Sequence, residues 1–369
     1  MANRAYKFRI YPNASQRELF AKTFGCCRFL YNQMLADKIR TYRESGKSLR
    51  CTPAAYKKQY PWLKEVDSLA LANVQLHLER AYRSFFEKKE TGFPKFRKKH
   101  SCRRSYTTNV VNGNIRLEGT HLRLPKAGPV RIRKHREIPE DWKLKSVTVS
   151  QEPTGKYFAS LLYEYQACEN QAAVTDAAEA EILGIDFAMS GMAVFSDGSR
   201  AEYPMYYQAG EDRLAREQRR LSRCVKGSRN YEKQKKRVAK CHEKVRNRRK
   251  DFQHKLSRLI ADQYDAVAVE DLNMKAMSRS LHFGKHTMDN GYGQFREMLS
   301  YKLEEQGKKL IRIDRFYPSS KRCSACGAIK KELRLDERIY ICGCGNCMDR
   351  DVNAAVNIRE EGRRLLEAA

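Results

Sequence analysis

Three acidic residues stand where they could act together on a phosphate ester. Asp186 and Glu270 each end a short apolar run, and Asp351 begins the last amphipathic stretch. Metal-dependent phosphodiester cleavage needs carboxylates that converge from separate elements and hold two ions about 3.5–4 Å apart. Mg²⁺ suits such a site because it accepts a few carboxylates and keeps its other positions for water and phosphate. We therefore predict Asp186, Glu270 and Asp351 as catalytic residues that bind Mg²⁺.

Taken alone, each of these acids is better explained as a residue that caps the end of a strand. The prediction depends on the three together, two of them directly after apolar strands in a strongly basic chain. Two neighbouring acids receive lesser roles. Asp271 is expected to support the local turn, and Asp349 to belong to the approach to the last helix.

Five of the twelve cysteines crowd between residues 323 and 347. Cys323 and Cys326 form a C-x-x-C-G knuckle, and a second group, Cys342, Cys344 and Cys347, follows a short hairpin. Two such pairs make a four-thiolate site for one structural Zn²⁺ in a ribbon too small for its own core. We favour Cys342 and Cys344 as the second pair; Cys344 with Cys347, an ordinary C-x-x-C, stays open.

The net charge of +29 points to a polyanionic partner. Residues 211–258 hold 19 Lys and Arg against 6 Asp and Glu, so the charge is clustered. Long phosphate backbones are the expected ligand. No apolar run reaches the 18 residues of a membrane span, and the N-terminus has no apolar leader. We therefore expect a cytoplasmic protein with no membrane partner.

The second half of the chain has the element order of an RNase H-like fold, β-β-β-α-β-α-β-α. The expected ranges are 182–186, 191–196, 200–205, 208–263 (a helix broken near 227–228), 266–271, 292–308, 310–316 and 351 onward. In that fold the three acids converge at one edge of the sheet. The nuclease domain is predicted at 181–317 and 349–369, with a zinc ribbon at 318–348.

The first half reads as a small β-barrel, residues 1–13 and 101–165, with a helical insertion at 14–100. Ser15 and Glu18 predict a capping box at the first helix, and another helix follows Asp67. The basic, aromatic loop 92–99 is either a base-stacking segment or a solvated turn. Residues 166–180 lack periodicity and read as a linker.

The chain resembles the TnpB family of bacterial insertion sequences, which is related to the type V CRISPR effector nucleases. The C-terminal motifs that carry the resemblance are Gly184–Asp186, Val269–Leu272, Pro318–Gly327 and Asp349–Ile358. The N-terminal ones are Thr23–Asn32, Phe93–Phe96 and Ser105–Thr108. Many members have C-x-x-C where Cys342-Gly343-Cys344 stands here, often followed by a histidine.

The resemblance implies an RNA-guided DNA endonuclease. Its guide would be a structured RNA from the transposon end, with one protein per RNA. The N-terminal region, a wedge-like barrel with a helical recognition insertion, would read a short flanking motif in double-stranded DNA. One RuvC-type site would cut both strands, with Asp186, Glu270 and Asp351 matching its first, second and third acids.

Other functions compete with this one. A guide-independent resolvase would cut branched or plain DNA without RNA. A nuclease-dead, RNA-guided DNA binder is less favoured because all three acids are present. A transposition accessory protein would need none of the acids, and a conventional transposase would join strands.

Overall fold

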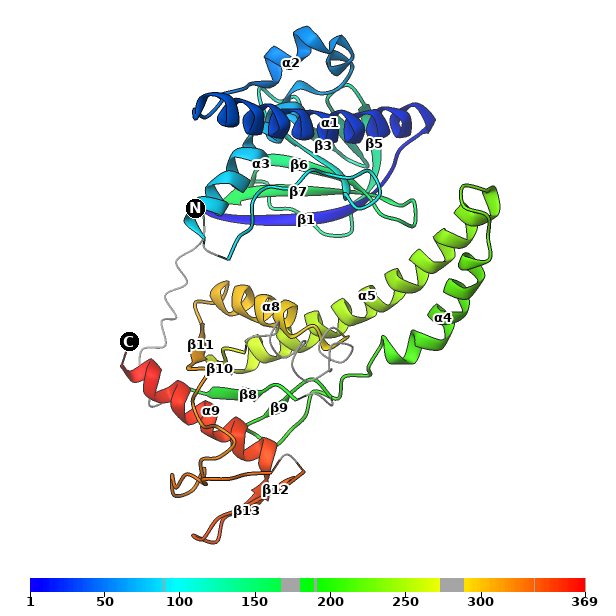
Figure 1. Cartoon of the computed structure of the whole chain (residues 1–369). Coiled ribbons are helices and arrows are strands. Elements are labelled where there is room, and N and C mark those ends of the chain that lie inside the picture. Colours follow the sequence, from blue (N-terminus) through cyan, green and yellow to red (C-terminus); the bar gives the residue numbers. More distant parts are fainter. Residues whose placement is uncertain (89, 167–179, 189–190, 273–288, 335, 369) are drawn as a thin grey trace. The chain divides into compact units, whose positions relative to one another are not determined.

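The computed structural model of the chain (Figure 1) describes residues 1–88, 90–166, 180–188, 191–272, 289–334 and 336–368. The chain forms two compact units, Met1–Ala167 and Cys168–Ala369. Except for its end residues, the linker that we predict at 166–180 lies outside the described residues. Within the described part, none of the helices has the length and apolar character needed to cross a membrane.

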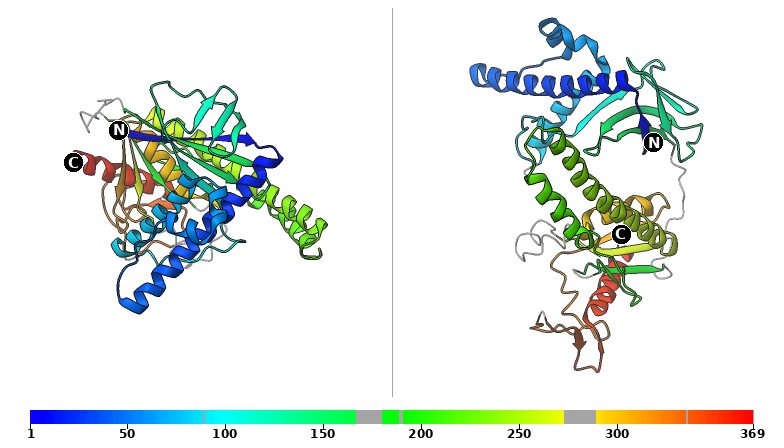
Figure 2. Two further views of the ribbon diagram at one scale, coloured as in Figure 1. Left: turned by 90° about the horizontal axis from the view of Figure 1, so that it is seen from above. Right: turned by 90° about the vertical axis from the view of Figure 1, so that its right-hand side faces the viewer.

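The N-terminal unit contains one curled antiparallel sheet of seven strands (Figure 2). They are β1 (Ala2–Tyr11), β2 (Arg104–Asn109), β3 (Arg116–Glu118), β4 (His121–Leu124), β5 (Gly128–Arg133), β6 (Lys143–Gln151) and β7 (Tyr157–Tyr165). Their order is β2-β6-β7-β1-β5-β4-β3, so the N-terminal strand pairs with strands that follow the helical segment. Between the described residues of β2 and β3 there is no ladder, so backbone pairing does not close the predicted barrel.

Four helical elements separate β1 from β2: α1 (Ala14–Ser45), α2 (Pro53–Gln59), η1 (Pro61–Glu65) and α3 (Ser68–Glu87). The predicted cap of the first helix is wrong by two residues. Asn13 is the N-cap, and it shares a reciprocal capping box with Gln16, at 2.9 and 3.0 Å. Asn caps a helix as well as Ser, and Gln can replace Glu in the box. The helix predicted after Asp67 is confirmed, and the Asp67 side chain caps it by accepting from the Leu69 amide at 3.0 Å.

Helix α1 lies across one face of this sheet (Figures 1 and 2). Phe20 and Leu30 of α1 share a buried cluster with Leu71 of α3 and with Val147 and Leu161 of the sheet. Burial of each large apolar side chain contributes about 1.5–3 kcal/mol. The apolar side chains of the two helices therefore form core with the sheet.

The C-terminal unit is built on a four-stranded sheet of order β11-β10-β8-β9. Its strands are β8 (Ile182–Asp186), β9 (Val194–Phe195), β10 (Ala266–Glu270) and β11 (Lys309–Ile313). Strand β9 is antiparallel and the other three are parallel. The helices among its described residues are α4 (Gln208–Ser222), α5 (Arg229–Gln263), α8 (Tyr292–Glu304) and α9 (Arg350–Glu367).

The predicted break in the long basic helix is confirmed, and Ser228 caps α5 by accepting from the Tyr231 amide at 3.1 Å. The strand predicted at 200–205 is wrong. An isolated bridge between Val194 and Arg200 forms there, with backbone hydrogen bonds from Ala201 to Ala193 at 2.9 Å and from Tyr203 to Gly191 at 3.4 Å, but no strand. Glu202 has a φ of +45°, which a strand cannot adopt, and Pro204 has no amide proton for a ladder.

Helices cover both faces of this sheet because its strands alternate their side chains. Ile185 and Val269 pack against Phe295 of α8, on the face that α5 also covers. Ile182 and Ala268 face Ile358 of α9 on the other side. The chain leaves β11 for a small ribbon with the hairpin β12 (Ile339–Ile341) and β13 (Cys347–Asp349), from which α9 starts directly.

Candidate functional site

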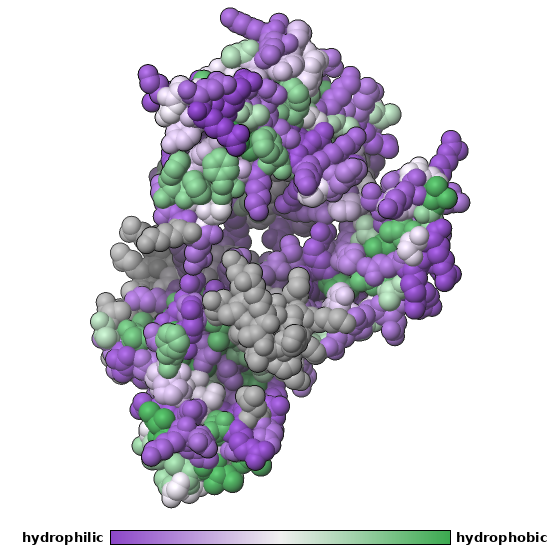
Figure 3. All heavy atoms as spheres, viewed as in Figure 1, coloured by the Kyte–Doolittle hydropathy of each residue, from purple (hydrophilic) through white to green (hydrophobic). Residues whose placement is uncertain are grey.

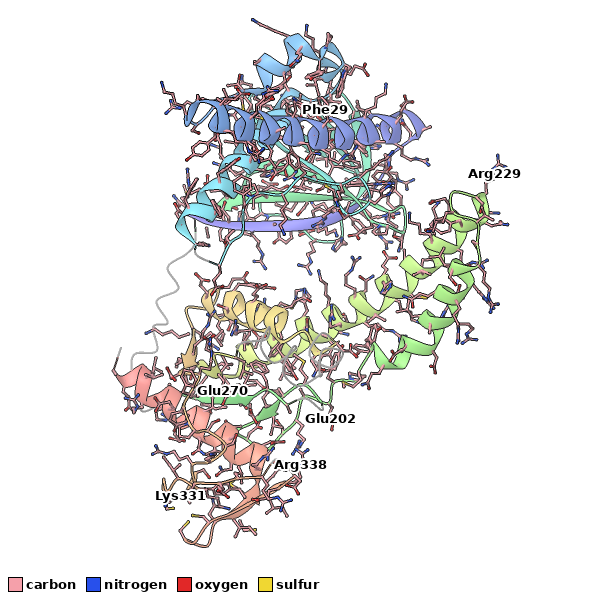
Figure 4. The ribbon with its side chains drawn as sticks, in the orientation of Figure 1. Phe29, Glu202, Arg229, Glu270, Lys331 and Arg338 are labelled. Carbon is pink, nitrogen blue, oxygen red and sulfur yellow. The ribbon has the colours of Figure 1, made fainter. Side chains whose placement is uncertain are left out.

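The sheet of the C-terminal unit brings two of the predicted acids to the same edge. In the parallel ladder between β8 and β10, Ile185 is paired with Val269. Asp186 follows Ile185 and Glu270 follows Val269, so the two acids lie at the carboxyl ends of neighbouring strands. Glu270 is labelled in Figure 4. Asp351 comes from the first turn of α9, and its charge acts on Asp186. The charges of Glu270 and Asp351 thus both act on Asp186, although among the described residues only the cysteines of the ribbon have their ligand atoms close enough together to hold an ion.

The carboxyl of Asp186 is poorly placed to carry a charge by itself. Burial, together with the charges of Glu270 and Asp351, raises its pKa to about 8, against a lowering effect of Arg350. Burial also raises the pKa of Glu270, while a hydrogen bond from Ser319 opposes that shift. A cation would reverse both shifts by stabilising the carboxylates. The all-oxygen donor set fits a hard ion such as Mg²⁺.

The two neighbouring acids are held in contacts with arginine and backbone. Asp271 pairs with Arg296 at 3.3 Å and with Arg315 at 3.1 Å. Asp349 caps α9 by accepting from the amides of Asp351 and Val352, and it pairs with Arg200 at 2.8 Å. Both residues therefore fix the elements that carry the site, and Asp349 begins the helix as expected.

Two residues beside the acids were not found by sequence reasoning. The Ser319 hydroxyl donates to Glu270 Oε1 at 2.5 Å. The Tyr292 hydroxyl donates to the carbonyl of Ala188, two residues after Asp186, at 2.5 Å. Ser319 lies inside one of the motifs that carry the family resemblance, but nothing in the motif assigns its hydroxyl a partner. Tyr292 begins a helix and reads from the sequence as core.

The ribbon gathers four of its five cysteines. The Sγ atoms of Cys323, Cys326, Cys342 and Cys344 all lie within 4.8 Å of one another. Cys323 and Cys344 are 3.7 Å apart, and Cys326 and Cys342 are 3.6 Å apart. Cys347 is exposed on β13 and outside this group. Four thiols without an imidazole fit a closed, structural Zn²⁺ site.

A basic groove lies between α4 and α5. Gln234 of α5 joins the two helices by donating to the Glu217 carbonyl at 3.0 Å. Hydrophilic side chains predominate on this hairpin (Figure 3), and Arg229 lies at its tip (Figure 4). The cations that line the groove are Arg213, Arg220, Arg237, Lys240, Lys244 and Arg248. Such a surface suits a phosphate backbone.

Comparison with known proteins decides the family. A protein of Streptomyces pristinaespiralis named "Putative RNA-guided DNA endonuclease" is 34% identical over 97% of this chain and 89% of its own length. The chain belongs to the TnpB family. A second TnpB relative, "Putative RNA-guided DNA endonuclease InsQ" of Escherichia coli K12, is 30% identical over 98% of this chain and 93% of its own length.

Family models match three parts of this TnpB chain. The OrfB_IS605 model, described as "Probable transposase", matches residues 162–281, and a "Cas12f1-like, TNB domain" matches 292–358. A "Helix-turn-helix domain" model matches 1–47, where the structure has β1 and one uninterrupted helix, α1. The resemblance drawn from the sequence motifs is confirmed.

The fold of this TnpB chain is that of a known effector. It matches the cryo-EM structure of a Cas12f1–sgRNA–target DNA complex with a TM-score of 0.62 and 13% identity, over 97% of this chain and 98% of that one. At 13% identity the match supports the fold alone. The chain is thus a mixed α/β protein with a curled sheet and a four-cysteine cluster.

Proposed function

We propose that this TnpB protein is an RNA-guided DNA endonuclease. A guide RNA from the transposon end, held by one protein, directs it to double-stranded DNA beside a short flanking motif. A single site then cleaves both strands by Mg²⁺-dependent hydrolysis. The observation that carries the proposal is that Asp186 and Glu270 end adjacent parallel strands and that the charge of Asp351 acts on Asp186, in a chain whose relatives are named as RNA-guided DNA endonucleases.

We assign the parts of the chain as follows. Residues 181–317 and 349–369 form an RNase H-like, RuvC-type domain, and 318–348 form a zinc ribbon. Residues 1–13 and 101–165 form a wedge-like barrel, with 14–100 as the recognition insertion. The acids at the ends of adjacent parallel strands support the first assignment. The four-thiol cluster supports the second.

Asp186, Glu270 and Asp351 are the catalytic residues of this proposal and would hold the metal. When bound, Mg²⁺ supplies a water nucleophile and neutralises charge on the leaving oxygen. Asp186 retains its proton near neutral pH, because its pKa is raised to about 8, so it must lose that proton to become a ligand. Asp349 and Arg200 keep the start of α9 in place, and Asp351 with it.

The groove between α4 and α5 is the proposed contact for nucleic-acid phosphates in the C-terminal unit. Its cations Lys240, Lys244 and Arg248 recur every four residues, so they follow one face of α5. A row of cations along a helix can follow a phosphate backbone without reading bases. This fits a system in which base pairing selects the sequence.

The loop 92–99 is the proposed base-stacking segment of the N-terminal unit. Phe93 is 43% exposed and Phe96 is 52% exposed. The Asn32 side chain of α1 fixes the loop by donating to the Arg97 carbonyl at 3.0 Å and accepting from its amide at 2.8 Å. Exposed rings on a fixed loop beside cations can stack bases.

The experiment that tests the function starts from the protein expressed with its flanking genomic DNA. Bound RNA is sequenced, and the complex is offered Mg²⁺ and duplexes that match the RNA, with Asp186→Ala as the control. We expect RNA-dependent and Mg²⁺-dependent cleavage that the control lacks. Cleavage without RNA would indicate a resolvase, and guided binding without cleavage would indicate a programmable DNA binder.

A further inference from the structure

Ser319 connects the zinc ribbon with the acidic site. It lies in the segment between β11 and the first cysteine knuckle, and the residue is 5% exposed. Its hydroxyl donates to Glu270 Oε1 at 2.5 Å. Hydrogen bonds to carboxylates are roughly twice as strong as those between neutral groups. Ser319 therefore orients one oxygen of Glu270.

The backbone of Ser319 is itself held by α9. Asn357 is a buried residue, and its side-chain amide donates to the carbonyl of Ser319 at 2.8 Å and to that of Arg322 at 2.7 Å. Loss of either acceptor would leave a buried donor without its partner, which is unfavourable. The segment 319–322 is thus fixed to the helix that carries Asp351.

One turn earlier on α9, Asn353 holds the cysteine knuckle. Its side chain is fully buried, donates to the Arg322 carbonyl at 2.7 Å and accepts from the Ser324 amide at 3.0 Å. Ser324 directly follows Cys323, the buried thiol of the four-cysteine cluster. A continuous set of hydrogen bonds therefore runs from the knuckle through α9 to Glu270.

We propose that Ser319 is the positioning residue of Glu270, and that the folded zinc ribbon sets the position of this carboxylate through Asn353 and Asn357. Ser319 touches neither substrate nor metal in this proposal, and acts by orienting a ligand. Partners of metal ligands typically contribute 10–100-fold to metal affinity or activity. The inference rests on the proposed function, because it takes Glu270 as a ligand of the catalytic metal.

The test compares Ser319→Ala with Ser320→Ala, which removes the same atom from the next, exposed residue. Ser319→Thr keeps a hydroxyl and is the rescue variant. Two quantities are measured: the Mg²⁺ concentration for half-maximal cleavage by the RNA-bound protein, and the rise in melting temperature of the full chain on titration with Mn²⁺. An Asp186→Ala chain defines the Mn²⁺ response that comes from other sites. Zinc content and guide-RNA affinity report on folding.

We expect Ser319→Ala to raise the Mg²⁺ requirement about tenfold and to shift the Mn²⁺ titration in the same direction. Zinc content and RNA affinity should stay at the wild-type level, as in Ser320→Ala, and Ser319→Thr should recover most of the metal affinity. Equal metal requirements for Ser319→Ala and Ser320→Ala would overturn the proposal. Loss of zinc from Ser319→Ala would also overturn it, since the hydroxyl would then support the ribbon.

The two readouts separate this inference from the proposed function. If the wild-type complex cleaves no DNA, the proposed function fails. The Mn²⁺ titration then still decides the role of Ser319, because it needs neither guide nor target. Suppose that Asp186→Ala weakens the rise in melting temperature with Mn²⁺ and Ser319→Ala does not. The acids would then still form a metal site, but the positioning role of Ser319 would be rejected.

Discussion

Gly184 of β8 lies directly against the backbone carbonyl of Ala355 in α9, with no space for a side chain between them. A β-carbon built at Gly184 would also come within 2.7 Å of the Arg359 amide nitrogen. The absence of a side chain lets α9 approach the sheet closely, two residues before Asp186. This contact sets how near Asp351, at the start of the same helix, can come to the other acids.

Gly184→Ala should therefore damage the site without changing any acid. The methyl group must displace α9, because the obstacle is backbone rather than a flexible side chain. We expect a loss of about 1–3 kcal/mol in unfolding free energy, as for other overpacked cores. Cleavage should fall at least tenfold, and guide-RNA binding should be retained. Gly293→Ala, in α8 with nothing within 4 Å of the added carbon, is the matched control. Equal cleavage by both variants would contradict the prediction.

Zinc content separates the two possible second pairs of cysteines. We expect one zinc ion per chain, lost on Cys344→Ser and on Cys342→Ser, because each removes one of four clustered thiols. Cys347→Ser should retain the ion, since this residue lies outside the cluster. The measurement is elemental analysis of the purified protein, with the melting temperature of each variant. Retention of zinc by Cys342→Ser together with loss from Cys347→Ser would favour the C-x-x-C alternative.

The stability of the metal-free protein should depend on pH through Asp186. An aspartate in the unfolded chain titrates near 4, whereas burial and two acidic neighbours raise the pKa of Asp186 to about 8. Below pH 4 both the folded and the unfolded chain hold this proton, so the raised pKa does not lower the stability. Between pH 4 and 8 the unfolded chain has released a proton that the folded one keeps. Stability therefore falls as pH rises, and the full cost is present above pH 8.

Asp186→Asn removes this dependence. We expect the unfolding free energy of the variant, relative to that of the wild type, to rise by roughly 2–5 kcal/mol between pH 4 and pH 8. Outside that range the difference between the two proteins should be constant. Thermal or urea unfolding in EDTA-treated protein measures it, with the zinc content verified. Asp212→Asn, at an exposed position of α4, is the charge-matched control. A difference that does not change with pH would show that the raised pKa is wrong.

The salt dependence of nucleic-acid binding tests the groove of α4 and α5. Replacing Lys240 and Lys244, which line it, with glutamine should reduce the slope of log K against log salt by about 0.9 for each lost contact to duplex phosphate. Lys233→Gln with Lys236→Gln removes the same charge from exposed positions of α5 outside the groove lining. Fluorescence anisotropy with a guide–target duplex gives both slopes. An equal reduction in the two double variants would indicate diffuse attraction by the net charge.

The four-residue set Arg219, Arg220, Lys235 and Lys236 tests the wider basic stretch predicted from the sequence. Only Arg220 of these lines the groove, and Lys235 lies 3.9 Å from Glu232. We expect neutralisation of all four to flatten the salt dependence as well, but by less for each charge than the loss of Lys240 and Lys244. An unchanged slope would reject the stretch 211–258 as a continuous interface and would leave only the groove residues Lys240 and Lys244 as candidates.

Local patterns in the sequence determined much of this protein. The acid at the end of each apolar run, the crowded cysteines and the helix break at Ser228 are set within a few residues, by strand alternation, knuckle spacing and capping. The family followed from the same motifs. The roles of Asp186, Glu270 and Asp351 remain predictions of that kind, now with their positions known.

The tertiary structure decided what depends on pairing between distant segments. The register of β8 with β10 puts Asp186 beside Glu270, and the packing of α9 on Gly184 brings in Asp351. The hydrogen bond from Ser319 to Glu270 forms because α9 fixes the segment that carries Ser319. Strand register and helix approach depend on contacts across about 80–170 residues of chain, which no local pattern of residue types specifies.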